Sequence, residues 1–454
     1  MRVAVLNIVG LSKSLLGPSA PGLTAFAEKH GLQSHQPEFP AVTCTAQSAV
    51  TTGSPPASHG IVANGWYDRE SAEPRFWKQS NHIVHGDKLW HKLRAENPHF
   101  TCAKLFWWYN MHADVDWSIT PRPLYPANGA KFFDIHTQPM AMRDEIKTDL
   151  GDFPFPAFWG PAAGIASSEW IAASAKWVDQ KHQPTLSLVY LPHLDYPLQK
   201  LGPDAPEIPA ETAKIDRVAT DLINYYESRN VRVIVHSEYG ISPVSTPVHL
   251  NRTFRANGWL SIKDELGRET LDCGGSRAFA IADHQVAHIY VNDRSVRDAV
   301  KSCLESAPGV ENVLEPAKLW GPGIATERAG DFIAVAKPDA WFTYYYWTDD
   351  SVAPDFARTI DIHRKPGFDP CELFLDPAIR FPKLRIAKFL LKKKLGIRGL
   401  LDVIPLDASL VRGSHGRAEV PADLRPVVIG AGRPINLATD LHDAILDAVR
   451  AGGH

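Results

Sequence analysis

Short apolar runs that end in polar, glycine-marked turns recur along the chain. Four of these runs are apolar at both odd and even positions, which is typical of strands covered on both faces of a sheet. They span residues 2–10, 185–195, 231–240 and 425–432. The pattern therefore predicts a buried, mostly parallel central sheet.

Helical patterns lie between these runs. Residues 86–97 and 209–230 carry apolar side chains at helical spacing, and the small-residue segment 42–53 (VTCTAQSAVTTG) opens another helix. Strands that alternate with helices predict a doubly wound α/β fold with helices on both faces of the sheet. In such folds the chemistry gathers at the carboxyl ends of the strands. Four polar residues lie at or near such ends: Asn7, Asp195, Glu238 and His415.

The pattern changes between residues 251 and 404, where the strands are short. Residues 276–291 are typical of a hairpin, and 361–374 of an ordered loop with many charges. We interpret 251–404 as an inserted α+β cap. The catalytic core would then consist of residues 1–250 and 405–454.

Residues 382–401 (PKLRIAKFLLKKKLGIRGLL) are basic and amphipathic. Such a segment is typical either of a solvated helix that packs its apolar face on the same protein or of a helix that binds a membrane surface or a partner. We favour the first interpretation.

The composition is that of a globular protein. Of the 454 residues 44% are hydrophobic and 22% charged, and the net charge of −3 gives no indication of nucleic-acid polymer binding. The five cysteines include no CxxC, which argues against a zinc finger or a disulfide framework. The chain starts as a strand and has no apolar run of about 18 residues, so we expect a cytoplasmic protein without a transmembrane segment. The oligomeric state is left open.

The segment 39–68 carries several motif residues in a fixed order. A proline (Pro40) precedes Thr43, the small-residue helix ends at Gly53, and H-G-I and N-x-x-Y-D follow, the latter starting at Asn64. A threonine at a helix start sits among unpaired backbone N–H groups at the positive end of the helix dipole, which suits an anionic phosphoryl group. An ordinary N-cap threonine is the alternative.

This order resembles the nucleophile segment of the type I phosphodiesterases and nucleotide pyrophosphatases of the alkaline phosphatase superfamily. Residues 190–204, 231–240 and 412–434 also resemble conserved parts of that family, whereas the middle of the chain is matched only loosely. The resemblance implies an alkaline-phosphatase-like fold and hydrolysis of phosphate esters at two zinc ions. It also implies that Thr43 is the nucleophile and forms a phosphothreonine intermediate.

The resemblance also implies two metal-ligand sets. In the second set Asp195 and His415 match the family, and Gln199 replaces a histidine. In the first set Thr43 is kept, and Glu238 and Tyr239 replace an aspartate and a histidine. At the end of the first strand Val9 stands where the family has a metal-binding aspartate. Asn7, on the same strand face, is either a substitute ligand or an ordinary core-capping asparagine.

The replacements exchange nitrogen ligands for oxygen donors. Zinc favours histidine and cysteine, whereas oxygen-rich sites suit magnesium or manganese. We therefore expect one divalent ion near Asp195 and His415, and a second that is weaker, of a harder type or absent. Zinc, manganese and magnesium are the candidates.

Other residues are candidates for substrate binding or for replacing lost ligands. Where the family has an oxygen-clamping asparagine this chain has Ala46, so Gln47 beside it is a candidate substitute. Asn64 belongs to the same motif, and Arg364 and Lys365 could bind an anionic substrate, unless their loop is merely salt-bridged. His193 and His236 could move into the metal site or be ordinary core histidines. His284 and His288 are four residues apart, which is metal-ligand spacing on a helix but in a hairpin only places both on one face.

The chain lacks P-loop, HExxH, GxSxG and GxGxxG motifs, which removes several common enzyme classes. The first hypothesis is a metal-dependent hydrolase of small phosphate esters, either mono- or diesters. The second is a non-hydrolytic descendant that binds a phosphorylated ligand or acts as a partner in a biosynthetic complex. The third is a related hydrolase or transferase acting on sulfate or phosphonate groups.

Overall fold

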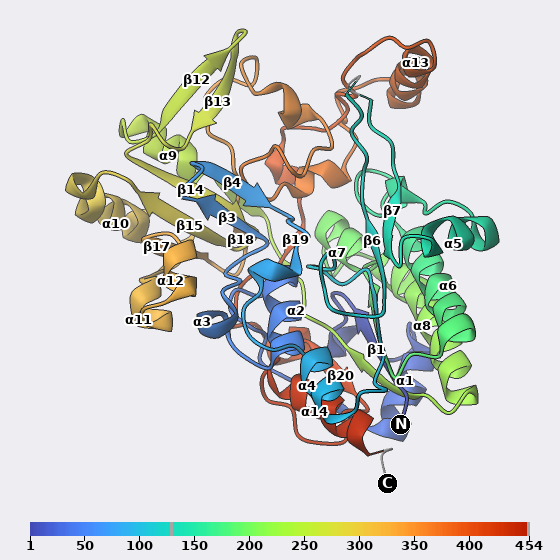
Figure 1. The fold of residues 1–454 in the computed structure, drawn as a ribbon. Helices are drawn as coiled ribbons and strands as arrows, with labels where there is room; N and C mark the ends of the chain where they lie inside the picture. Colours follow the sequence, from blue (N-terminus) through green and yellow to red (C-terminus); the bar gives the residue numbers. More distant parts are fainter. Residues whose placement is uncertain (128–129, 452–454) are drawn as a thin grey trace.

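The computed structural model describes residues 1–127 and 130–451 and contains a central sheet of eight strands (Figure 1). Its strands are β1 (Val3–Ile8), β2 (Leu32–Ser34), β5 (Cys102–Leu105), β6 (Trp117–Pro121), β7 (Ile135–Gln138), β8 (Leu186–Leu191), β9 (Arg232–His236) and β20 (Val427–Ile429). They lie in the order β2-β20-β9-β1-β8-β5-β6-β7. The five central strands, β9 to β6, run parallel, and the strands at both edges are antiparallel.

The burial of the central strands explains their sequence. Every residue of β1 and β8 is buried, so side chains on both faces must be apolar or internally bonded. All four predicted strands are present. The last of them, β20, runs antiparallel to β9.

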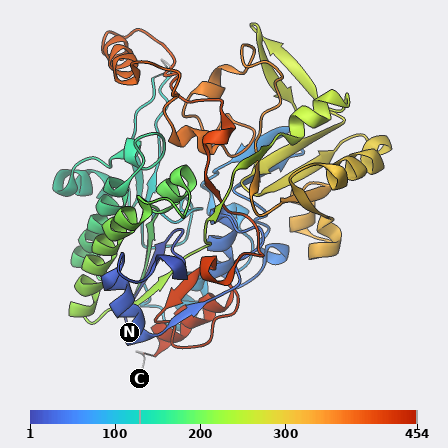
Figure 2. The ribbon, with the colours of Figure 1, turned by 180° about the vertical axis from the view of Figure 1, so that it is seen from behind.

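Helices cover both faces of the sheet, which confirms the predicted doubly wound architecture. The group α1 (Pro21–His30), α5 (Met142–Leu150), α6 (Ile165–His182) and α8 (Ile208–Ser228) packs on one face, and Figure 2 shows the arrangement from behind. On the other face lie α2 (Thr43–Thr52), α4 (Leu89–Glu96) and α14 (Asp440–Arg450). The helices predicted at 86–97 and 209–230 correspond to α4 and α8.

A second, antiparallel sheet lies at the upper left of Figure 1. It consists of β14 (Ala278–Asp283), β15 (Val286–Val291), β17 (Phe332–Ala336) and β16 (Val310–Leu314), in that order. The helices α9 (Leu250–Ala256), α10 (Arg297–Ser306), α11 (Pro316–Trp320) and α12 (Ile324–Arg328) accompany it. The predicted hairpin is β14–β15. This sheet has its own hydrophobic core, into which Tyr67 and Phe76 of the hairpin β3 (Gly65–Asp68) and β4 (Glu73–Phe76) also pack.

Short elements complete the chain. The remaining α-helices are α3 (Pro56–His59), α7 (Asp195–Leu201) and α13 (Pro382–Lys394). Three further strand pairs are β10 (Ser242–Pro243) with β19 (Gly413–Ser414), β11 (Thr246–Val248) with β18 (Ala340–Phe342), and β12 (Ser261–Glu265) with β13 (Arg268–Asp272). Single 3-10 turns span Lys13–Leu15, Asn81–Ile83, Phe155–Ala157, Arg294–Val296, Asp355–Arg358, Pro370–Leu373, Ala408–Leu410 and Ala422–Leu424.

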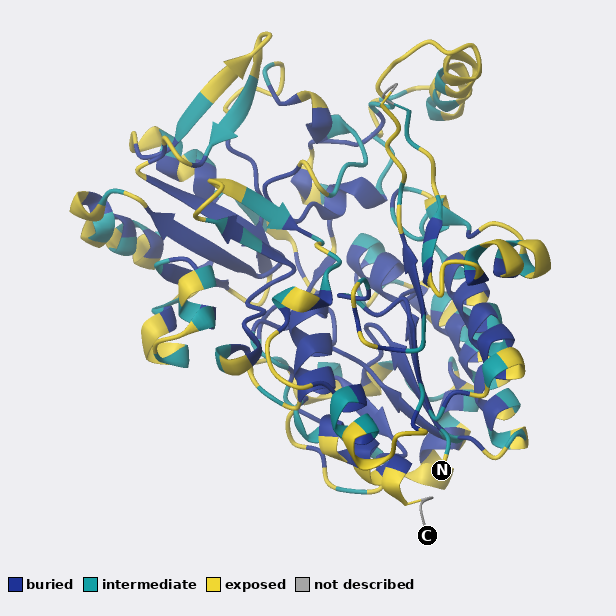
Figure 3. Ribbon diagram, viewed as in Figure 1, coloured by how far each residue is buried: buried dark blue, intermediate teal, exposed yellow. Residues whose placement is uncertain are grey.

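Helix α13 differs from our expectation. It occupies the predicted basic segment, but none of its residues is buried (Figure 3). Ile386 and Phe389 are half-buried, whereas Leu384, Leu390 and Leu391 are 67%, 55% and 59% exposed. The expectation that this helix packs its apolar face on its own protein is therefore wrong for most of that face.

Within residues 1–127 and 130–451, each helix is either too short or too polar to cross a membrane.

Candidate functional site

The predicted site residues meet at one edge of the central sheet. Strands β9, β1 and β8 are neighbours and parallel, so their carboxyl ends lie together. Asn7 is near the end of β1, Asp195 follows β8 as the first residue of α7, and Glu238 and Tyr239 follow β9. His415 follows β19 and completes the group.

Helix α2 brings Thr43 to this edge. All ten residues of α2 are buried, which explains why the segment has small side chains and no bulky ones. The hydroxyls of Ser48, Thr51 and Thr52 donate to carbonyl oxygens one turn earlier, at 2.7, 2.8 and 2.7 Å. These three hydroxyls are therefore satisfied within the helix itself. Thr43 is its first residue.

A hydrogen-bonded chain links Thr43 to Asp195 through Tyr239. Thr43 Oγ1 lies 3.0 Å from Tyr239 Oη, and Tyr239 donates to Asp195 Oδ1 at 3.3 Å. The Tyr239 ring stacks on His415, with ring centres 3.6 Å apart and planes 9° apart. Burial raises the pKa of the Tyr239 phenol well above its ordinary value, so the phenol stays protonated and available as a donor.

Asp195, Gln199 and His415 form a second group of contacts. Gln199 lies one helical turn after Asp195 in α7, and its Nε2 donates to Asp195 Oδ2 at 2.8 Å. His415 Nδ1 donates to the carbonyl of Ala41 at 2.7 Å, so Nε2 carries the lone pair, 3.8 Å from Asp195 Oδ1. Burial lowers the pKa of His415 and raises that of Asp195 to about 7. In the described part of the chain, His415 Nε2 and Gln199 Oε1 have no hydrogen-bond partner.

Glu238 is held by two amides. Asn7 Nδ2 and Gln47 Nε2 both donate to Glu238 Oε1, at 2.5 and 2.6 Å. Burial raises the pKa of Glu238 to about 8. Gln47 Oε1 accepts from the backbone N–H of Trp108 at 2.7 Å. Both amide atoms of Gln47, a predicted substrate-binding residue, are therefore hydrogen-bonded within the protein, to Glu238 and to the backbone.

The two donor sets differ in how well they fit a cation. Asp195, Gln199 and His415 offer a carboxylate, an amide oxygen and an imidazole lone pair, and two of these donors have no other partner, which fits one divalent ion. The first set does not fit zinc, because Val9 has no donor and the Tyr239 phenol stays protonated. Across the described ranges no cluster of three or more His, Cys, Asp or Glu side chains is arranged around a metal position.

Asn64 connects the start of α2 to the second sheet. Its Oδ1 accepts from the backbone N–H of Cys44 at 3.0 Å, and its Nδ2 donates to Asp283 Oδ1 at 3.1 Å. Asp283 is the last residue of β14, and His284 follows in a two-residue turn with a φ of 61°. The His284 ring lies 3.8 Å from the His415 ring. The hairpin thus places His284 beside the site.

The other candidate histidines have different neighbours. His193 Nε2 lies 3.1 Å from a carboxylate oxygen of Glu211, and His236 packs on Trp107 with ring centres 5.5 Å apart. His288 Nε2 donates to a backbone carbonyl at 3.1 Å. His193 and His236 therefore have the ordinary core role that was their alternative interpretation, and His288 bonds to the backbone.

Arg364 and Lys365 take different places, and the prediction for Lys365 needs correction. Lys365 is buried and lies 2.7 Å from both Asp369 and Glu372, so its charge is used inside the protein. Arg364 lines the large cavity described next, although it also pairs with Asp355 at 3.0 Å. The charged loop is salt-bridged at Lys365 and open to the cavity at Arg364.

A cavity of about 890 Å³ opens above the site. Its floor includes Thr43, Asp195, Tyr239, His284 and His415. Aromatic side chains form much of the wall, namely Trp77, Trp108, Phe158, Trp159, Tyr190 and Phe368. Sequence reasoning missed most of them as site residues. The aromatic cluster at 106–117 was the available signal, because it supplies Trp108.

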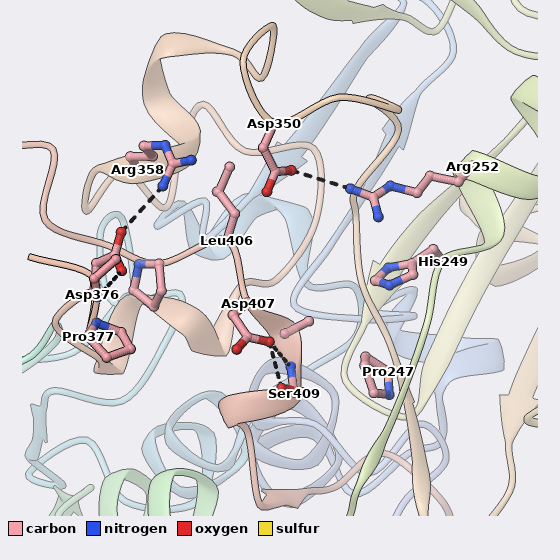
Figure 4. A pocket seen from close by; sticks show the side chains of 13 residues that line it. Pro247, His249, Arg252, Asp350, Arg358, Asp376, Pro377, Leu406, Asp407 and Ser409 are labelled. Carbon is pink, nitrogen blue, oxygen red and sulfur yellow. Dashed lines mark hydrogen bonds and ion pairs between the residues drawn. The ribbon is translucent and has the colours of Figure 1, made fainter.

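A second pocket, of about 630 Å³, is shown in Figure 4. Charged side chains in its wall pair with one another: Arg252 with Asp350 at 3.7 Å and Arg358 with Asp376 at 3.4 Å. Because these charges already compensate each other, this pocket is a weaker candidate for an anion site than the cavity above Thr43.

Comparisons with known proteins identify the family of the chain and its fold. A model of the type I phosphodiesterase / nucleotide pyrophosphatase family matches residues 3–369. An uncharacterized pyrophosphatase/phosphodiesterase of Schizosaccharomyces pombe is 24% identical over 294 residues. The match covers 61% of this chain and 49% of that protein, so the chain spans about half the length of this curated relative.

Two solved structures share the fold at 14% sequence identity. One is murine ectonucleotide pyrophosphatase / phosphodiesterase 5, in an inactive form in complex with AMP, with a TM-score of 0.58. The other is phosphonoacetate hydrolase from Sinorhizobium meliloti in complex with phosphonoformate, with a TM-score of 0.61. Each match covers 99% of this chain and 95% of the other. These likenesses confirm the predicted alkaline-phosphatase-like fold.

Proposed function

Because the chain belongs to the type I phosphodiesterase / nucleotide pyrophosphatase family, we propose that it hydrolyses phosphoric esters with Thr43 as the nucleophile. The observation that carries the proposal is the place of Thr43 Oγ1. It lies at the amino end of a buried helix, on the floor of the large cavity, 3.0 Å from Tyr239 Oη. The substrate carries a phosphoryl group, in line with the AMP bound by the murine relative.

The reaction proceeds in two displacements. The amino end of α2 attracts the phosphoryl oxygens through its backbone N–H groups and dipole. Thr43 Oγ1 gives its proton to solvent water and bonds to phosphorus, the bond from phosphorus to the alcohol oxygen breaks, and the alcohol takes a proton from water as it leaves. A second water then attacks phosphorus, the bond from phosphorus to Thr43 Oγ1 breaks, one proton of that water returns to Thr43 Oγ1, and the phosphate product leaves. Tyr239 Oη orients Thr43 Oγ1 before the attack.

We propose one divalent cation, held by Asp195, Gln199 and His415. When bound, it supplies positive charge beside the phosphoryl oxygens and lowers the pKa of a nearby hydroxyl or water. A donor set of one imidazole nitrogen with two oxygens suits zinc or manganese better than magnesium. The substituted first set, with Asn7, Glu238 and Tyr239, positions Thr43 and carries no zinc.

The test is turnover of aryl phosphate mono- and diesters with zinc, manganese or magnesium. We expect Thr43→Ala to lower kcat at least ~10³-fold, because removing a nucleophile removes the covalent path, and Thr43→Ser to retain part of the activity. The control is Thr52→Ala, whose hydroxyl bonds within the same helix. An acid-quenched reaction should give a peptide that carries one phosphoryl group on Thr43. A wild-type protein without turnover under any metal, or turnover unchanged in Thr43→Ala, would contradict the proposal.

Metal binding can be measured without turnover. We expect the purified protein to bind one zinc or manganese ion, and His415→Ala to lose it, since His415 Nε2 has no other partner in the described chain. Two bound ions in wild type would contradict the single-cation proposal.

One observation favours a second function. Tyr239 Oη stands between Thr43 and Asp195, and Glu238 is held by the amides of Asn7 and Gln47. A site closed by such hydrogen bonds also suits a protein that binds a phosphorylated ligand without cleaving it, alone or in a biosynthetic complex. Metal-free protein that binds phosphate esters and leaves them intact would support this function.

A further inference from the structure

The cavity above Thr43 is larger and more apolar than a phosphoryl group requires. A cavity of about 890 Å³ exceeds the space for a phosphate alone, and its outer wall is built of carbon-rich side chains. Six of them are Phe133, Phe155, Phe158, Ile386, Phe389 and Leu401. Water at such a wall has few partners, so an apolar group of the substrate would displace it favourably.

The cavity reaches the surface beside α13. Leu390 and Leu400 line the cavity, although their side chains are 55% and 53% exposed. The cavity therefore opens to solvent along this helix. Lys393 of α13 donates to the carbonyl of Lys131 at 3.2 Å, which joins the helix to the opposite rim. A long ligand with its head at Thr43 would therefore leave the cavity past α13.

A second apolar stripe on α13 faces away from the cavity. Leu384, Leu391 and Leu395 are 67%, 59% and 66% exposed and follow one another at positions i, i+7 and i+11. The cavity-lining residues Ile386, Phe389, Leu390 and Lys393 occupy another face. One apolar face of α13 therefore lines the cavity, and the other is exposed to solvent.

The charge around this stripe is strongly positive. Residues 376–402 contain eight Lys and Arg against two Asp, in a chain whose net charge is −3. Asp402 pairs with Arg385 of this segment, and Asp376 pairs with Arg358 outside it. A basic helix with exposed leucines complements an anionic lipid surface, where leucines enter the interface and lysines meet the headgroups.

We propose that the substrate is a phosphoric ester of a long apolar alcohol, taken from an anionic lipid surface on which α13 lies. The phosphoryl group sits at Thr43, and the apolar chain follows the aromatic wall and leaves the cavity past α13, toward the lipid. This inference rests on the proposed function only for the placement of the phosphoryl group at Thr43. Chain recognition and lipid binding are measured without turnover.

The first test measures how affinity depends on chain length. Methyl, butyl, octyl and dodecyl phosphonates are titrated below their micelle concentrations, with the fluorescence of the cavity tryptophans as the signal. We expect the affinity to rise up to about fourfold per added methylene, because each CH₂ leaves water. Phe389→Asp, in the cavity wall, should flatten this dependence. The matched control Leu384→Asp, on the other face of α13, should leave it unchanged.

An affinity that does not change with chain length overturns the apolar-chain assignment, even if small aryl esters are hydrolysed. A steep dependence without turnover of any ester leaves this assignment standing and contradicts the proposed hydrolysis. The two failures are therefore distinguishable.

The second test is sedimentation of the full chain with vesicles. We expect at least tenfold more bound protein with vesicles of phosphatidylserine and phosphatidylcholine than with phosphatidylcholine alone, and a loss of this difference at high salt. Leu384→Asp with Leu391→Asp should abolish sedimentation and keep the chain-length dependence. Equal sedimentation with neutral and anionic vesicles, or none with either, would overturn the lipid-surface assignment.

Discussion

Lys365 offers a quantitative test of how a buried charge is stabilised. Its side chain is 1% exposed, and the partner carboxylates of Asp369 and Glu372, both at 2.7 Å, are 2% and 1% exposed. Lys365→Met removes the cation and leaves two buried carboxylates facing each other. Breaking a buried pair in this way costs about 3–5 kcal/mol of unfolding free energy, or roughly a 10²- to 10⁴-fold change in the unfolding equilibrium.

The neighbouring residue is a matched control. Arg364 pairs with Asp355 at 3.0 Å, but these side chains are 54% and 45% exposed. Arg364→Met should therefore cost about 0–1 kcal/mol, because water already screens the pair. Urea unfolding followed by tryptophan fluorescence compares the two variants in the same loop.

The pH dependence of the loss identifies its cause. If carboxylate repulsion is responsible, Lys365→Met should lose less stability at pH 5 than at pH 8, since a proton can then replace the ammonium. An equal loss for both variants, or a Lys365→Met loss that does not change with pH, would refute the reasoning.

Two further predictions concern other parts of the core. Burial raises the pKa of Glu38 from 4.5 to about 7, so its stabilising contribution is complete below pH 4.5 and lost as the pH rises toward 7. Glu38→Gln should remove this part of the pH–stability profile, on the order of 3 kcal/mol, and an unchanged urea midpoint profile would contradict it. A Cβ on Gly240 would lie 1.6 Å from the carbonyl oxygen of Leu424, so Gly240→Ala should cost about 1–3 kcal/mol and displace Tyr239. Gly164→Ala, whose nearest atom is 3.9 Å away, is the control, and equal melting temperatures for the two variants would count against the packing argument.

The sequence predicted the central sheet well because burial on both faces leaves a local signature. Strands β1 and β8 are fully buried, so their apolar runs are continuous. A continuous apolar run does not distinguish a parallel strand from an antiparallel one. β20 is as buried as the parallel strands but runs antiparallel to β9, because its place is set by the chain that leads into it.

The candidate site was predictable only as far as its residues follow strands or start helices. Thr43, Asp195 and His415 line one cavity, as expected from their positions. The bridging role of Tyr239 depends on a side-chain direction, which no local pattern encodes. For Lys365 the partners Asp369 and Glu372 were visible in the sequence, but the inward turn of the loop was not.

The self-bonded hydroxyls of α2 have a consequence for how the site tolerates change. Ser48, Thr51 and Thr52 need no partner from the helices and strands around them. Those neighbours can therefore vary in sequence without leaving a buried hydroxyl unpaired. Volume is then the main constraint that the surroundings place on these positions. A lineage could remodel the shell around α2 extensively and still present the threonine at its tip in the same place.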